Sequence, residues 1–153
     1  MMNTAADHLY TLHRNAFALA PVIQSFYLNW EPMEKDILLS YLVLPVVSFP
    51  AMQEYLHTAN RTSSIRTMTS ESSRLVGLAL RISEYEPITN KALLILRSDE
   101  SLQLNDDLSV LASENRQSEN ADPKMLRYAR QLAMVFRNES VVTIYRMLGL
   151  KSL

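Results

Sequence analysis

Apolar residues in the first third of the chain recur at the three- and four-residue spacing of an amphipathic helix. The first stripe begins at Leu19 and continues through Val22, Ile23, Phe26, Tyr27 and Trp30. Pro21 either opens this helix or kinks it, and Glu31-Pro32 ends it. Residues 1–14 are predicted to be a poorly ordered segment, which leaves residues 15–153 as a single helical domain.

The pattern predicts further helices in the middle of the chain. One covers residues 34–47 and bends near Pro45, and Ser48 is expected to cap a short helix that ends before residue 60. Residues 60–73 are polar and rich in Ser and Thr. A helix over 71–85 follows, and Pro87 is expected to start another one that carries Ile88, Ala92, Ile95 and Leu96 on its inner side.

After residue 100 the spacing of apolar residues changes. Leucines and valine at 102, 104, 108, 110 and 111 flank the turn signal Asn105-Asp106-Asp107, which predicts a short β-hairpin. Residues 113–121 are polar and are predicted to form a mobile loop. Asp122-Pro123 is typical of a helix start. A last helix begins at Ser140, with Gly149 as its C-terminal cap.

These elements predict a mainly α fold: a single compact helical domain with one small β-hairpin. Gly77 and Gly149 are the only glycines, and so few glycines favour packed helices over a sheet-rich fold. The order helix, helix, hairpin also describes half of a winged helix, so a winged-helix-like middle is the more specific alternative.

Composition narrows the classes of function. The formal net charge of the 153-residue chain is −1, which disfavours direct, autonomous DNA binding. There are no cysteines, so disulfides and thiolate metal sites are excluded. The N-terminus lacks the order of a signal peptide. The apolar run over 37–47 is shorter than the roughly 20 residues that a membrane span needs. We therefore expect a cytoplasmic protein.

No constellation of residues predicts catalysis, a metal or a cofactor. Ser72-Ser73 lacks the flanking glycine of a nucleophile elbow, and neither glycine lies in a phosphate-binding loop. The histidines at 8, 13 and 57 are too scattered for a metal site. The acidic residues at 99, 100, 106 and 107 straddle the predicted hairpin and are interpreted as a solvated turn. We expect no enzymatic activity.

The basic residues are the better candidates for a binding surface. Arg61 and Arg66 lie in the hydroxyl-rich stretch, and Arg74 and Arg81 follow with a spacing that places them on one helical face. Arginine with Ser and Thr suits a phosphate backbone or a carboxylate-rich partner. A capping and salt-bridging segment is the open alternative. The arginines on the C-terminal helix are interpreted as a solvated face and are Arg127, Arg130 and Arg137.

An ordered set of stretches resembles a known family. The stretches are NAFALAPVIQSF from Asn15, LLSYLVLPVV with Pro45, Arg61-Thr62-Ser63-Ser64, EPITNKALLIL, SLQLNDDLSVL and the ending VVTIYRMLGL. Together they resemble the middle component of the prokaryotic three-component ABC-ATPase defence systems, a group that includes the small subunit of Lamassu anti-phage systems. The resemblance spans about residues 15–150.

The resemblance implies a non-catalytic accessory or scaffold subunit of an anti-phage and anti-plasmid complex. Its partners would be an SMC/Rad50-like ABC ATPase, whose heads it would contact, and an effector such as a nuclease, whose activation it would help control. The subunit would contact DNA only through the complex or weakly, and the resemblance implies no contact with a membrane. The candidate partner-binding residues are Arg61, Thr62, Ser63, Arg66, Arg74, Val142, Thr143, Tyr145 and Arg146.

Two rival functions stay open. A winged-helix-like DNA-binding regulator would use residues 88–97 and the hairpin, although that helix offers only Lys91 and Arg97 as basic groups. A small hydrolase or nuclease would require a metal-dependent activity in the purified chain.

Overall fold

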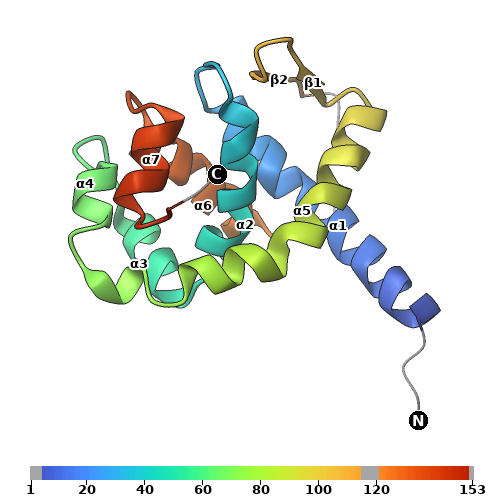
Figure 1. The fold of residues 1–153 in the computed structure, drawn as a ribbon, viewed down its shortest axis with the longest axis horizontal. Coiled ribbons are helices and arrows are strands. Elements are labelled where there is room, and N and C mark those ends of the chain that lie inside the picture. The colour runs from blue at the N-terminus through green and yellow to red at the C-terminus, as the bar shows by residue number, and fades with distance from the viewer. Residues whose placement is uncertain (1–4, 115–120, 152–153) are drawn as a thin grey trace.

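The first helix is longer than the apolar stripe that predicted it. The computed structural model describes residues 5–114 and 121–151, with side chains from residue 15 onward, and α1 spans Ala5–Leu28. Pro21 lies inside α1, so the prediction that it opens the helix is wrong. The predicted stripe is confirmed as the buried face, with Ile23 and Phe26 fully buried. The N-terminal half of α1 projects away from the other helices (Figure 1).

The most apolar segment forms the centre of the core. A 3₁₀ turn, η1 (Asp36–Leu39), leads directly into α2 (Ser40–Val47), which contains Pro45. All side chains from Leu42 to Val47 are buried, because α2 packs against α1, α3, α5 and α6. The helix predicted over 34–47 is therefore confirmed in outline, but its first turn is a 3₁₀ turn that begins two residues later.

The short helices after α2 differ from the predictions at their caps. α3 spans Pro50–Thr58, and its N-cap is Phe49 in an extended conformation. Ser48 was predicted to be this cap, which is wrong, because its hydroxyl donates to the carbonyl of Leu44 at 2.6 Å and so finishes α2 instead. The polar stretch that follows contains α4 (Ile65–Met68) and a 3₁₀ turn, η2 (Ser72–Arg74).

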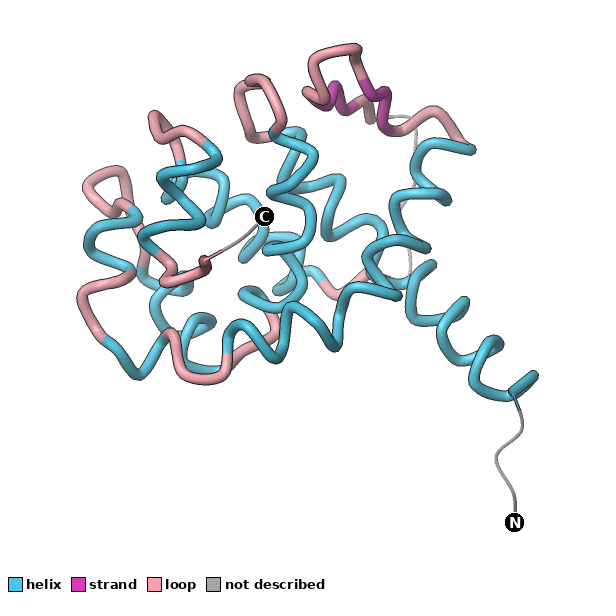
Figure 2. The backbone as a smooth tube through the Cα atoms, viewed as in Figure 1, coloured by secondary structure: helices cyan, strands magenta, loops and turns pink. Residues whose placement is uncertain are grey.

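The helix pair predicted across Pro87 is one continuous helix. α5 spans Leu78–Ser98 after Gly77, whose φ of 69° is a left-handed conformation that glycine adopts readily. Pro87 lies within α5, and the ribbon changes direction near the middle of this helix (Figure 2). Both Pro87 and Ser83, four residues earlier, are exposed, so water can reach the carbonyl that the proline leaves without a donor. Because one continuous helix takes the place of the predicted helix pair, residues 78–98 do not form the helix–turn–helix that a winged helix requires.

The predicted hairpin is confirmed and is held against the turn that precedes η1. β1 (Leu102–Leu104) pairs antiparallel with β2 (Val110–Ala112), with Gln103 opposite Leu111. Two backbone bonds fix the hairpin to the turn before α2: the amide of Lys35 donates to the carbonyl of Asp107 at 2.9 Å, and that of Ile37 donates to Leu108 at 3.1 Å. The hairpin therefore projects from the helices as an anchored element (Figure 1).

The last two helices begin and end as predicted. α6 spans Pro123–Phe136, and the carboxylate of Asp122 accepts from the amide of Lys124. α7 spans Val141–Met147 with Ser140 as N-cap. Gly149, at φ 79°, follows its C-terminus, where the amides of residues 149 and 150 donate to the carbonyls of Arg146 and Tyr145. The mobile loop predicted over 113–121 falls largely outside the described residues.

One buried carboxylate, which the sequence pattern did not single out, connects three of these elements. Asp36 is fully buried and accepts three N–H groups, from the indole of Trp30, the backbone of Met33 and the backbone of Val110 in β2. Burial raises the pKa of Asp36, and these donors oppose the shift because they stabilise the charged form. The carboxylate of Asp36 therefore joins the end of α1, η1 and the hairpin.

No single described helix is long and apolar enough to cross a membrane. The pair Asp36–Val47 and Pro50–Thr58 meets the length and composition test only when the two helices are joined across a bend of 101°.

Candidate partner-binding surface

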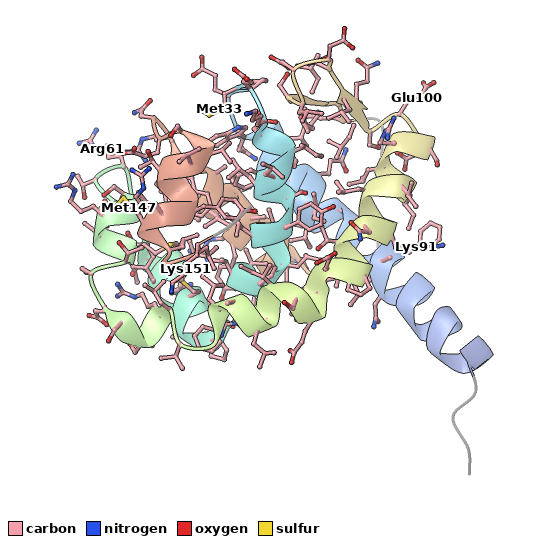
Figure 3. All side chains as sticks on the ribbon, viewed as in Figure 1. Met33, Arg61, Lys91, Glu100, Met147 and Lys151 are labelled. Atoms are coloured by element: carbon pink, nitrogen blue, oxygen red, sulfur yellow. The ribbon has the colours of Figure 1, made fainter. Side chains whose placement is uncertain are left out.

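Two segments that the sequence singled out separately come together at one end of the molecule. α4 packs against α7, so the turn that carries Arg61 lies beside the C-terminal helix. In Figure 3, Arg61 and Met147 are neighbours at the end of the molecule opposite Glu100. We call Arg61, Arg66, Val142 and Arg146 the α4–α7 surface. The sequence offered residues 61–66 and the C-terminal helix as separate candidates, and the structure places the two segments side by side.

The charges of the α4–α7 surface are free of partners within the described residues. Arg61, Arg66 and Arg146 are exposed, and the one ion pair found in that part of the chain joins other residues. The segments 60–70 and 140–151 contain no Asp or Glu. Val142 adds an apolar side chain that is 51% exposed. The surface therefore presents unpaired guanidinium groups around an apolar side chain, which suits a carboxylate- or phosphate-bearing partner.

The backbone below Arg61 is held in place by α6. The guanidinium of Arg137 donates to the carbonyls of Arg61 and Met134, and to that of Ser63 at 3.3 Å. Gln131 donates to the carbonyl of Ala59 at 2.8 Å. The interpretation of Arg137 as part of a solvated face is thus wrong. Sequence alone carries no signal for this contact, because its partners lie more than 70 residues apart.

Arg127 is a second arginine whose assignment to the solvated face is wrong. Its guanidinium donates to the carbonyl of His57 at 2.7 Å and lies 3.1 Å from Nδ1 of the same residue. Arg130, by contrast, is exposed. Arg127 therefore ties α6 to the end of α3, whereas Arg137 ties the C-terminal end of α6 to the turn over 61–63.

The hydroxyl groups of the predicted Arg-Thr-Ser stretch shape the turn itself. The carboxamide oxygen of Asn60 accepts from the amide and the hydroxyl of Thr62 at 2.9 and 2.6 Å, and the hydroxyl of Ser63 accepts from the amide of Asn60. Thr143 is engaged likewise, with its hydroxyl 2.9 Å from that of Ser140. Thr62, Ser63 and Thr143 therefore hold the backbone of the surface in place, whereas Arg61 and Arg66 present its charge.

Arg74 and Arg81 do not form the shared face that their spacing predicted. Arg74 lies in η2, where its guanidinium donates to the carbonyls of Thr67 and Met68 at 3.1 and 3.2 Å, and Glu71 is 3.6 Å away. Arg81 lies over the Phe49 ring at 3.6 Å, and burial lowers its pKa. Both arginines thus donate to carbonyls within the chain, as the capping alternative expects, and we leave Arg74 out of the candidate surface.

Tyr145 also turns inward. Its side chain is only 7% exposed, and its hydroxyl donates to the carbonyl of Leu38 at 2.6 Å. Burial, with a smaller contribution from Tyr41, raises the pKa of Tyr145 to about 12. Tyr145 therefore joins α7 to η1, and we leave it out of the candidate surface.

Replacing Tyr145 with phenylalanine is expected to lower the free energy of unfolding by about 1 kcal/mol at neutral pH, because the Leu38 carbonyl loses its donor. The folded-state pKa is above the unfolded value of about 10, so the stability from the protonated hydroxyl is complete below pH 10 and is lost as pH rises through the folded pKa, about 12. The margin of wild type over Tyr145→Phe should therefore shrink between these values in urea titrations. A margin that stays constant would contradict this.

The surface of the described residues is hollowed in more than one place. One pocket, of about 230 Å³, is lined by Glu54, Tyr55, Glu71 and Arg74 among others, and a second, of about 370 Å³, is lined by Trp30, Met33 and Arg137 among others. No group of three His, Cys, Asp or Glu side chains could hold a metal ion in the part of the chain described.

The helix that the DNA-binding alternative would place in the groove of DNA carries charges of both signs. Within α5, Lys91 is half-buried and Arg97 is exposed, while Glu84 and Glu86 are exposed as well. The hairpin beside it contains only acidic charges. Carboxylates repel the phosphate backbone, so this part of the molecule is poorly suited to DNA.

Comparison with known proteins gives one match, which covers almost the whole chain. The family model described as "ABC-three component (ABC-3C) system Middle Component 3" matches residues 3–152. No curated protein and no solved structure matches the chain significantly.

Proposed function

The chain belongs to the middle component 3 family of ABC-three component systems, and from this membership we propose that it is a non-catalytic scaffold subunit. In this role it bridges the heads of an SMC/Rad50-like ATPase and an effector, such as a nuclease, in an anti-phage complex of the cytoplasm, and it helps control activation of the effector. Membership makes it a middle component of such a defence system. The bridging role and the control of the effector are our proposals.

The observation that carries the proposal is the α4–α7 surface. A chain that uses Arg74, Arg81, Arg127 and Arg137 for internal contacts leaves Arg61, Arg66 and Arg146 exposed and unpaired at one end. Arginine is enriched in protein interfaces because its planar group binds carboxylates in two-point contacts. These three arginines give this end of the molecule exposed groups that can bind an acidic partner.

The opposite end of the molecule carries the opposite charge. The hairpin segment 98–114 contains Asp99, Glu100, Asp106, Asp107 and Glu114 and no lysine or arginine. Two ends of opposite sign favour contact with two different partners, because a surface complementary to one end repels the other. This separation of charge supports a subunit placed between two other components.

Charge reversal of the α4–α7 surface tests the proposal. The triple variant Arg61→Glu, Arg66→Glu, Arg146→Glu is expected to weaken binding to one of the two other components of its own system by about a hundred-fold, because it replaces three attractions with repulsions. Binding is measured by titrating the purified chain against each component separately, at several salt concentrations.

A matched control reverses three exposed basic residues elsewhere: Arg97→Glu, Lys124→Glu, Arg130→Glu. These exposed side chains are not part of the α4–α7 surface, and the change in net charge is the same, so binding to the component that this surface recruits should stay close to wild type. Equal losses in both triple variants would show only a net-charge effect and sink the proposed surface. Tight, salt-sensitive DNA binding by the isolated chain would favour the DNA-binding regulator instead.

A further inference from the structure

The β1–β2 hairpin exposes three leucines: Leu104, Leu108 and Leu111 are 38%, 42% and 45% exposed. Leu104 is the register partner of Val110, so it lies on the inner face of the hairpin, where Val110 is buried and donates its amide to Asp36. Leu111 is the partner of Gln103 and lies on the outer face, and Leu108 lies in the turn between the two strands. Figure 3 shows the hairpin as a projection beyond the helices.

Leu108 occupies a backbone position that leucine disfavours. Its φ is 66°, and its amide donates to the carbonyl of Asn105 at 2.9 Å while the amide of Asn105 donates to the carbonyl of Ser109. This is a hairpin turn that ends in a left-handed residue, where glycine or asparagine normally lies because a branched side chain crowds the backbone. A leucine there lowers the stability of the free chain, and much of its side chain stays exposed.

The charge around these leucines has one dominant sign. The hairpin segment carries acidic residues only, and the turn that anchors it adds Glu31 and Glu34 against Lys35. Exposed apolar side chains within an acidic border suit an apolar socket bordered by lysine or arginine. Nucleic acid is a poor match, because its phosphates would meet these carboxylates.

We propose that the hairpin is a second docking element, which inserts Leu108 of its turn, together with Leu111 of its outer face, into an apolar socket bordered by basic residues on another protein of the same system. This inference rests on the proposed bridging function and adds to it the surface used for the second partner. The anchoring through Asp36, Lys35 and Ile37 keeps the hairpin in place before binding, which lowers the entropic cost of docking.

The decisive variant is Leu108→Gly, which removes the side chain and relieves the backbone. We expect its urea midpoint to equal or exceed that of wild type, and its affinity for one of the two other components to fall by about ten-fold. Leu108→Asn should give the same two results as Leu108→Gly, because asparagine also tolerates the left-handed conformation. Leu94→Ser replaces a leucine that is 60% exposed on α5 and should bind as wild type does.

Each outcome decides between distinct conclusions. Unchanged affinity of Leu108→Gly for both components overturns the hairpin proposal alone, while wild type that binds neither component overturns the bridging function and the hairpin with it. A lowered urea midpoint in both Leu108 variants overturns the proposal by making Leu108 a packing residue. A wild-type dimer in sedimentation equilibrium that Leu108→Gly dissociates assigns the socket to a second copy, and so overturns the assignment to a different protein.

Discussion

Replacing Asp36 with alanine is expected to lower the free energy of unfolding by about 4 kcal/mol, since three N–H donors lose the carboxylate that they share. Oδ2 accepts from the indole of Trp30 at 3.1 Å and from the amide of Met33 at 2.8 Å, while Oδ1 accepts from the amide of Val110 at 2.8 Å. The bonds from Trp30 and Val110 are buried, where water cannot take the place of the carboxylate, and the bond from Met33 is partly buried. Loss of this one side chain therefore loosens the end of α1, η1 and the hairpin together.

Urea denaturation followed by tryptophan fluorescence measures this effect directly, because Trp30 is the only tryptophan. Asp36→Asn should fall between wild type and alanine, since its amide group can accept at one oxygen but turns a donor toward one of the three N–H groups. Asp106→Ala, at an exposed position in the same hairpin, should change stability by less than about 0.5 kcal/mol. A loss at Asp36 as small as that at Asp106 would refute the anchoring role.

Replacing Phe26 with alanine is expected to cost about 4 kcal/mol, because it empties the place where α1 meets α6. Phe26 is fully buried. Its ring is stacked on Trp30 with centroids 5.5 Å apart, and it meets Tyr27 and Phe136 edge-on at 5.1 and 6.3 Å. The variant loses the buried area of the ring and all three aromatic contacts.

Thermal and urea unfolding by circular dichroism would quantify the loss. Leu94→Ala removes an apolar side chain that is 60% exposed, so it should cost well under about 1 kcal/mol. If Phe26→Ala unfolds at the same midpoint as wild type, the aromatic cluster does not join the two helices as described. Neither Phe26 nor Asp36 belongs to the α4–α7 surface. The molecules of Phe26→Ala or Asp36→Ala that fold should therefore present the same exposed arginines as wild type.

The features that the sequence predicted best are those that neighbouring residues determine. Asp122 and Ser140 cap their helices through bonds to amides two and three residues away, and Gly149 ends α7. The hairpin turn is equally local. Because both partners of each interaction lie within a few residues, the pattern of residues carries the whole signal.

The features that the sequence did not predict depend on distant partners. Pro87 has the local signature of a helix start, but the packing of α5 against α1 and α2 continues the helix through it. Asp36 stands at the start of an apolar run as an acidic residue without a local partner, since Val110 lies 74 residues away. Arg61 and Arg74 look alike in the sequence, and only the position of Thr67 and Met68 shows that Arg74 is used internally.

The long first helix also sets a constraint on how the chain is made. The apolar face of α1 is covered mainly by α5 and α6, and α6 ends at Phe136, more than 100 residues after α1. At a synthesis rate of about 5–20 residues per second, the cover of this face stays incomplete on the ribosome for roughly 5–20 s. Until α6 emerges, Phe26 lacks its native contact with Phe136, so the part of α1 that α6 covers is exposed in the nascent chain and raises its tendency to aggregate.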